Sequence, residues 1–151
     1  MKNIYCANIN KRIRWKTRQV MVGDIGIGDN NPIRIQSMTT THTMDTKSTV
    51  EQSIRMIESG CEIIRITAPS IKEAKNLKTI RKNLRSNGYS SPIVADIHFT
   101  PNAALVAAEL VEKVRINPGN YADKKQFEIY DYTEKAYDEE LERIRNRFIP
   151  L

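Results

Sequence analysis

Four polar–isoleucine–polar triplets are the parts of this sequence whose residue types and spacing could do chemistry. They are Arg34-Ile35-Gln36, Arg65-Ile66-Thr67, Asp96-Ile97-His98 and Arg115-Ile116-Asn117. Side chains alternate between the two faces of a strand, so each triplet places both polar groups on one face and its isoleucine on the other. Because an unpaired buried charge is costly, the polar faces must meet an ionic partner or a ligand.

The residue types in the triplets indicate an anionic ligand. Arg65 and Arg115 carry planar guanidinium groups, which match phosphate oxygens with paired hydrogen bonds. Asp96 and His98 add an acceptor and a titratable group suited to hydroxyls. The predicted ligand-binding set is Gln36, Arg65, Asp96, His98, Arg115, Asn117 and Asn120, with no catalytic residue and no metal ligand assigned.

A structural interpretation stands beside the ligand-binding one. Arg–Asp pairs often form salt-bridge layers inside barrels, and a single histidine at a strand end is more often structural than catalytic. For Arg34, the earliest of these positions along its strand, we expect the structural role. For the other positions, the repetition of the triplet favours a ligand site.

The elements that must position these residues alternate between strand and helix. Ser48 with Glu51 and Ser70 with Glu73 have the spacing of helix capping boxes, and Thr100 precedes a proline suited to a first helical turn. Glycines at 60 and 88 can end the first two helices, and a fourth helix runs from Thr133 to about residue 147. The predicted strands are 32–38, 62–68, 92–98 and 113–117.

This alternation predicts parallel βαβ units and an α/β fold. The first three triplets begin 31 residues apart, and the fourth follows 19 residues later. A (β/α)₈ barrel of ~250 residues uses about 31 residues for each βα unit, and its sites lie at the carboxyl ends of the strands. We therefore expect the first four βα units of a TIM barrel. A β-hairpin with a turn at Gly23-Asp24 should precede them, within 18–28.

Composition limits the class of protein. The 151 residues are 40% hydrophobic and 28% charged, as in a globular protein. No apolar run approaches the ~20 residues that span a bilayer, so no membrane association is expected. Cys6 and Cys61 lie in unrelated contexts, which favours a reducing cytoplasm over disulfides or a complete metal site.

A net charge of +6 includes a dense basic stretch at 11–18. Residues 1–17 are predicted to form an exposed basic arm, and 18–151 the N-terminal half of a barrel domain. The alternative is a basic RNA-binding module, whose binding would depend steeply on salt. A further alternative is a pterin-binding synthase, another phosphate-handling barrel, although no pterin-specific motif is present.

The motifs also point to one family. Pro32–Thr39, Ile64–Thr67, Val94–Phe99 and Lys113–Asn120 stand in this order along the chain. Together they resemble the 4-hydroxy-3-methylbut-2-en-1-yl diphosphate synthases of the non-mevalonate isoprenoid pathway, over about residues 14–151. The stretch 121–134 is similar to the longer plant and chlamydial form of that enzyme.

The resemblance implies a function for the polar residues. In this family the barrel binds 2-C-methyl-D-erythritol 2,4-cyclodiphosphate, and the predicted site residues are implied to contact it, with Asn120 the weakest candidate. A separate C-terminal domain carries a 4Fe-4S cluster, and ferredoxin or flavodoxin supplies the electrons that open the ring and expel water. The implied protein is a homodimer of the bacterial cytoplasm that binds no nucleic acid.

This chain departs from the family in its extent. The second half of the barrel and the iron–sulfur domain are expected to be absent from it, and neither cysteine lies in a cluster-binding motif. A cluster needs several thiolates. We therefore expect this chain, by itself, to bind no cofactor and to be inactive.

Overall fold

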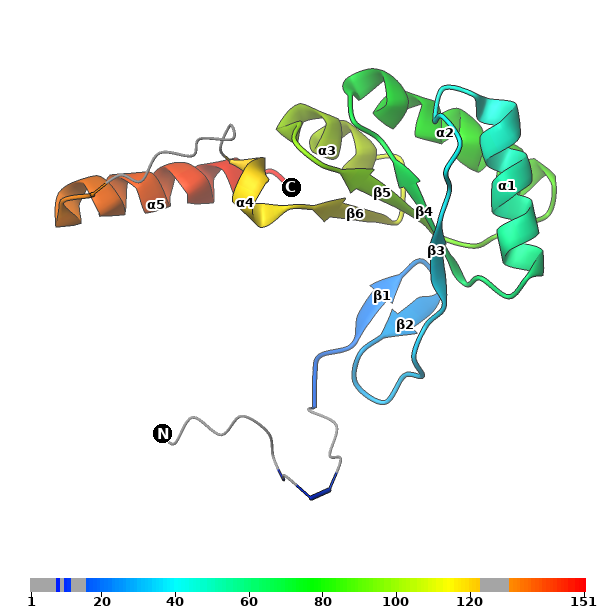
Figure 1. Cartoon of the computed structure of the whole chain (residues 1–151), viewed down its shortest axis with the longest axis horizontal. Coiled ribbons are helices and arrows are strands. Elements are labelled where there is room, and N and C mark those ends of the chain that lie inside the picture. Colours follow the sequence, from blue (N-terminus) through cyan, green and yellow to red (C-terminus); the bar gives the residue numbers. More distant parts are fainter. Residues whose placement is uncertain (1–7, 9, 12–15, 123–130) are drawn as a thin grey trace.

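A parallel sheet forms the centre of the computed structural model, which describes residues 8, 10–11, 16–122 and 131–151 (Figure 1). Its strand order follows the sequence, and the first strand lies at an edge. In a doubly wound sheet the first strand would lie in the centre. This order confirms the predicted succession of βα units. The strands are β3 (Gln36–Met38), β4 (Ile63–Thr67), β5 (Ile93–Ile97) and β6 (Lys113–Ile116).

Three helices connect these strands and cover one face of the sheet (Figure 1). They are α1 (Thr46–Glu58), α2 (Ile71–Ser86) and α3 (Pro101–Ala108). Ile66 of β4 and Leu77 and Ile80 of α2 are fully buried between the sheet and the helices. The isoleucines of the second and third triplets belong to this core, as their alternation predicted.

The helix ends follow the predicted signals with one correction. The prediction of a capping box at Ser48 and Glu51 is wrong, because α1 begins at Thr46 and its N-cap is Asp45. The carboxylate of Asp45 accepts the backbone N–H of Ser48 at 3.1 Å. An aspartate three residues earlier satisfies the same unpaired N–H group, so Ser48 lies within the first turn. At α2, Ser70 is the N-cap as predicted, and its hydroxyl hydrogen-bonds to Glu73.

The chain after β6 contains a short helix that the sequence did not indicate. Pro118–Tyr121 forms α4, at the start of what was predicted to be a long loop. The predicted fourth helix is confirmed as α5 (Glu134–Phe148), capped by Thr133. Figure 1 shows α5 extending away from the sheet, and the rings of Tyr121 and Phe148, 4.8 Å apart, join it to α4. The motif residues 123–130 lie outside the described part.

A β-hairpin of β1 (Val20–Val22) and β2 (Ile25–Ile27) precedes the sheet, as predicted. Gly23 adopts φ +58° in its turn, a conformation that favours glycine. A Cβ at this position would lie 3.4 Å from the Cβ of Pro92 and 3.5 Å from the Cγ of Glu112. The hairpin therefore lies beneath the amino ends of β5 and β6, at the opposite end of the strands from the predicted site.

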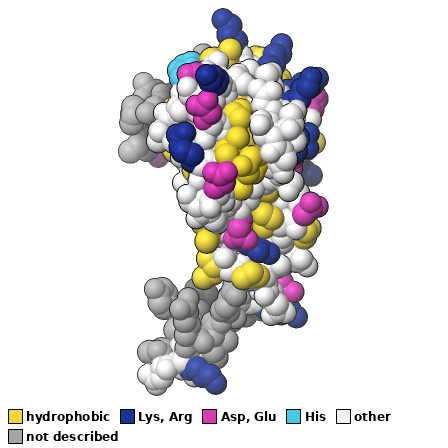
Figure 2. Space-filling model, turned by 90° about the vertical axis from the view of Figure 1, so that its right-hand side faces the viewer, with side chains coloured by type: hydrophobic (Ala, Val, Ile, Leu, Met, Phe, Trp, Pro, Cys, Tyr) yellow, Lys and Arg dark blue, Asp and Glu magenta, His cyan; other side chains and the backbone are white. Residues whose placement is uncertain are grey.

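The open edge of the sheet at β3 is apolar. Ile33 is 82% exposed and Ile35 59% exposed. A groove of about 380 Å³ lies between this edge and α1, lined in part by Ser37, Met56 and Cys61. Figure 2 views the side of the molecule occupied by α1 and shows a band of hydrophobic side chains between charged groups.

Two further predictions concern parts of the chain at its periphery. The basic arm at 1–17 lies mostly outside the described residues, and so does half of the stretch 11–18, on which the RNA-binding alternative depends. Within the described residues, no helix is long and apolar enough to cross a membrane.

Candidate functional site

Four of the predicted polar residues, Arg65, Asp96, His98 and Arg115, meet on the face of the sheet opposite the helices. Asp96 is at the centre, because β5 lies between β4 and β6. In the parallel register it stands opposite Thr67 on β4 and Arg115 on β6. The neighbours Ala95 and Ile97 are buried in the helix-covered core, so Asp96 projects from the other face.

Asp96 accepts hydrogen bonds from two arginine side chains and lies close to the imidazole of His98. Its carboxylate receives Nη2 of Arg65 at 2.6 Å and Nη1 of Arg115 at 3.2 Å. Nε2 of His98 lies 3.3 Å from Oδ2 of the same carboxylate. The Asp96 side chain is only 1% exposed, whereas those of Arg65, Arg115 and His98 are 27%, 40% and 42% exposed. A carboxylate thus lies beneath two guanidinium groups and an imidazole that face solvent.

Both arginines keep hydrogen-bond donors that have no partner among the described residues. Arg115 bonds Asp96 through one nitrogen. Arg65 likewise bonds it through Nη2, and its buried Nε has no partner in the structure. A guanidinium has five N–H donors. The site therefore presents unpaired donors on two positive groups and contains one negative charge, an arrangement suited to an anion.

The other predicted site residues are less closely involved. Asn117 caps α4, where its Oδ1 accepts the N–H of Gly119 at 3.2 Å, so its amide nitrogen remains available as a donor. Gln36 is exposed at the start of β3 and pairs in register with Ile63, two residues before Arg65. Within the described residues, neither Gln36 nor Asn120 is hydrogen-bonded to Asp96 or its partners. Sequence reasoning placed Gln36 on the correct strand, whereas Asn120 lies in α4 and not in the predicted loop, and the structure joins neither residue to the cluster.

Arg34 has the structural role expected from its position. Its guanidinium pairs with Glu62 at 2.8 Å, and its Nε donates to the carbonyl of Gly26 in the hairpin at 2.9 Å. The carboxylate of Glu62 also accepts the backbone N–H of Ile35. This hydrogen bond, opposed by desolvation and supported by Arg34, lowers the pKa of Glu62. Arg34 therefore fastens the hairpin to the sheet and lies away from the site.

Sequence reasoning missed the residues that hold the loop between β3 and α1, which borders the site. The hydroxyl of Thr43 donates to the carbonyl of Thr67 at 2.5 Å, and the amide of Asn76 donates to the carbonyl of Thr43 at 2.8 Å. The backbone N–H of Thr39 donates to the carbonyl of Arg65. The one available signal was Asn76 itself, a polar residue next to the buried Leu77 on an amphipathic helix.

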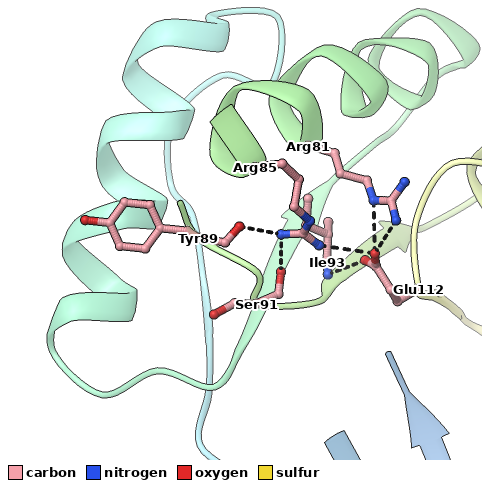
Figure 3. A network of polar contacts seen from close by, with 6 residues as sticks. All are labelled: Arg81, Arg85, Tyr89, Ser91, Ile93 and Glu112. Atoms are coloured by element: carbon pink, nitrogen blue, oxygen red, sulfur yellow. Dashed lines mark hydrogen bonds and ion pairs between the residues drawn. The ribbon is translucent and has the colours of Figure 1, made fainter. Parts of the chain in front are cut away.

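A second polar network lies at the amino ends of the strands (Figure 3). Arg81 and Arg85 of α2 both pair with Glu112, at 2.8 and 3.2 Å. Arg85 also donates to the carbonyls of Tyr89 and Ser91. Because active sites of barrels lie at the carboxyl ends of the strands, this network belongs to the supporting structure and not to the candidate site.

The described residues do not fit a metal or cluster site. They contain no group of three histidine, cysteine, aspartate or glutamate side chains that could hold a metal ion. Cys61 is buried, and its thiol donates to the carbonyl of Ile63 at 3.2 Å.

Comparison with known proteins gives one consistent result. Residues 17–144 match the family described as the GcpE TIM-barrel domain. A protein of Akkermansia muciniphila named 4-hydroxy-3-methylbut-2-en-1-yl diphosphate synthase (flavodoxin) is 50% identical over all 151 residues, which cover 26% of its length. A Leptospira interrogans protein of the same name is 55% identical over 138 residues, 91% of this chain and 21% of that protein.

A plant relative carries a related name. The Arabidopsis thaliana protein named 4-hydroxy-3-methylbut-2-en-1-yl diphosphate synthase (ferredoxin), chloroplastic, is 47% identical over 148 residues, 97% of this chain and 20% of that protein. The chain thus spans between a fifth and about a quarter of the length of these relatives.

Proposed function

Because the chain belongs to the GcpE TIM-barrel family, we propose that it supplies the substrate-binding N-terminal half of a barrel acting on 2-C-methyl-D-erythritol 2,4-cyclodiphosphate. The reaction is the reductive opening of the cyclic diphosphate, with loss of water, to 4-hydroxy-3-methylbut-2-enyl diphosphate. The activity is that of an oxidoreductase in isoprenoid biosynthesis. The names of the relatives above support this assignment.

One observation carries the proposal: Arg65 and Arg115 converge on Asp96 toward the carboxyl ends of the strands, and both guanidinium groups keep N–H donors without a partner among the described residues. Guanidinium groups bind phosphate oxygens with charge-assisted hydrogen bonds. We assign the diphosphate group to this position. The wider set of contacts proposed for the substrate is Gln36, Arg65, His98, Arg115, Asn117 and Asn120, arranged around Asp96.

Residues 18–151 are proposed to be half of the barrel, with the other half and the cluster domain supplied by polypeptide that this chain does not contain. The exposed apolar edge at β3 supports this assignment, because a closed barrel would cover it. In the reaction of this family a 4Fe-4S cluster supplies electrons. The residues present here do not fit that cluster, so no step of the chemistry is assigned to them. Flavodoxin or ferredoxin is the proposed electron donor, and a homodimer is the proposed assembly.

The alternatives have less support. No relative described above is named a pterin-binding synthase, and no contact in the described residues favours one. RNA binding would depend on the basic stretch at 11–18, of which residues 12–15 lie outside the described part.

Calorimetric titration of the chain with 2-C-methyl-D-erythritol 2,4-cyclodiphosphate tests the proposal. We expect saturable binding of one molecule per site, which weakens as the salt concentration rises because the contact is between charges. Absence of heat and of any NMR shift at the Arg65 and Arg115 positions would overturn the proposed function.

A further inference from the structure

We propose that Asp96 is a positioning residue that never touches the ligand and that gathers two arginines from non-adjacent strands onto one compact polyanion. The inference rests on the proposed function and deepens it. It replaces the expectation that Asp96 itself contacts the substrate.

Burial is the first argument. The Asp96 carboxylate is 1% exposed, while its three partners are between 27% and 42% exposed. A ligand arriving from solvent therefore meets Arg65, His98 and Arg115 before it could reach the carboxylate beneath them.

The hydrogen bonds of Asp96 are the second argument. Oδ2 lies 2.6 Å from Arg65 and 3.3 Å from His98, and Oδ1 lies 3.2 Å from Arg115. Each oxygen thus accepts a hydrogen bond from one arginine, and Oδ2 also lies next to His98. An anionic ligand would moreover be repelled by the carboxylate, since like charges disfavour each other at close range.

The strand arrangement is the third argument. Arg65 on β4 and Arg115 on β6 are separated by β5. Because neighbouring strands lie roughly 4.8 Å apart, the two backbones are about 10 Å apart. Yet both guanidinium groups reach one carboxylate. Because both guanidinium groups are held at one carboxylate, their unused N–H donors lie close together. A single compact group with several oxygens, such as a diphosphate, can therefore bind both arginines.

These arguments predict the sign of a mutational effect. By its charge alone, replacement of Asp96 with asparagine should strengthen anion binding, because a nearby negative charge is removed. If Asp96 positions the arginines, the same replacement should weaken binding. The asparagine amide nitrogen cannot accept a hydrogen bond, so at least one guanidinium loses its anchor.

The test is calorimetric titration of the 151-residue chain with inorganic diphosphate, which offers oxygens but no substrate hydroxyl. We expect Asp96→Asn to bind at least about tenfold more weakly than the wild type, the effect of losing one charge-assisted anchor. Asp24→Asn is the matched control. It removes the same charge from the exposed hairpin turn, and its affinity should equal that of the wild type. Equal or tighter binding by Asp96→Asn would overturn the inference.

A measurement on the wild type keeps the inference testable if Asp96→Asn does not fold. In NMR titrations with inorganic diphosphate, the side-chain Nε–H signals of Arg65 and Arg115 should shift together, at one-to-one stoichiometry. Shifts confined to one arginine, or two saturation steps, would contradict the shared site. If the wild type does not bind diphosphate, the proposed function fails and this inference with it. If the wild type binds diphosphate and Asp96→Asn binds it equally well, the inference fails but the proposed function stands.

Discussion

The carboxylate of Glu112, directly before β6, accepts the backbone N–H of Ile93 at the first residue of β5, at 2.8 Å. Glu62, directly before β4, has the same relation to Ile35 on the β3 side, also at 2.8 Å. Each glutamate thus extends the hydrogen bonding between two strands beyond their amino ends. At Glu112 the carboxylate is held in turn by two arginines of α2 (Figure 3).

Replacement of Glu112 should therefore lower the free energy of unfolding. Glu112→Ala leaves the N–H of the buried Ile93 without its acceptor, which costs about 1–3 kcal/mol at pH 7. Urea unfolding followed by circular dichroism measures the change. Glu109→Ala, at an exposed position three residues earlier, should change the stability little. Equal losses in the two variants would contradict the role of Glu112.

The contribution of Glu112 should also depend on pH. Partial burial opposes its ionisation, but the Ile93 hydrogen bond and Arg81 together lower its pKa below the ordinary value of 4.5. A carboxylate with a lowered pKa in the folded state stabilises the fold above its unfolded pKa, and this stabilisation is lost as the pH falls through the folded pKa. The difference between wild type and Glu112→Ala should shrink when urea unfolding is repeated below pH 4.5. A difference that is constant between neutral and acid pH would refute this assignment.

Truncation of either site arginine should weaken substrate binding. Arg65→Ala and Arg115→Ala each remove charge-assisted hydrogen bonds of about 1.5–3 kcal/mol, which is a loss of roughly 10- to 150-fold in affinity for the cyclodiphosphate. His98→Asn should have a smaller effect, because an uncharged hydrogen bond contributes less. Calorimetry measures all three variants. Arg34→Ala is the matched control, since this arginine pairs with Glu62 at the other end of the strands, and it should lower stability while leaving affinity unchanged. Full affinity in both site variants would rule out their diphosphate role.

The 151-residue chain should self-associate through its sheet edges. The strand order leaves β3 and β6 each paired on one side only within the described residues. Unpaired strand edges recruit other chains unless a charge blocks them. Ile35 lies directly before β3 and is 59% exposed. A charge at this position should therefore block pairing of the β3 edge with another chain. We expect Ile35→Lys to reduce the mass measured by gel filtration with light scattering.

Val20→Lys is the control for that experiment. Val20 is 57% exposed but belongs to the hairpin and not to the four-stranded sheet, so its replacement should leave the mass unchanged. A wild-type chain that elutes as a monomer with dispersed amide signals would show that the four-stranded unit is self-sufficient.

Anaerobic reconstitution of this chain with iron and sulfide should not produce a stoichiometric cluster. The sequence contains two cysteines, whereas a cluster requires several thiolates. Cys61 is moreover buried, with its thiol hydrogen-bonded to a backbone carbonyl. Absorbance in the visible range, with iron quantified per chain, gives the result. One cluster per chain would contradict the assignment of the ligands to polypeptide outside it.

The sequence by itself determined the succession of strands and longer helices, and the faces on which the polar side chains of β4 and β5 lie. Strand and helix periodicities are local properties, so the alternation around Ile66 and Ile97 could be predicted without knowledge of any partner strand. The hairpin turn at Gly23 and the structural role of Arg34 were likewise correct. At the start of α1, where Asp45 and Ser48 are both plausible caps, local signals competed, and the sequence indicated the wrong residue.

Only the tertiary structure decided which of these side chains meet. The register between β5 and β6 places Arg115 opposite Asp96, and the side chain of Arg65 reaches the same carboxylate from β4. Thr43 supports the site by bonding to Thr67, and Glu112 supports the strand ends by bonding to Ile93. In both cases a loop brings together residues that are distant in the sequence. Such contacts leave no periodic signal in the chain, because they are selected by the geometry of the assembled layers and not by the conformation of any one segment.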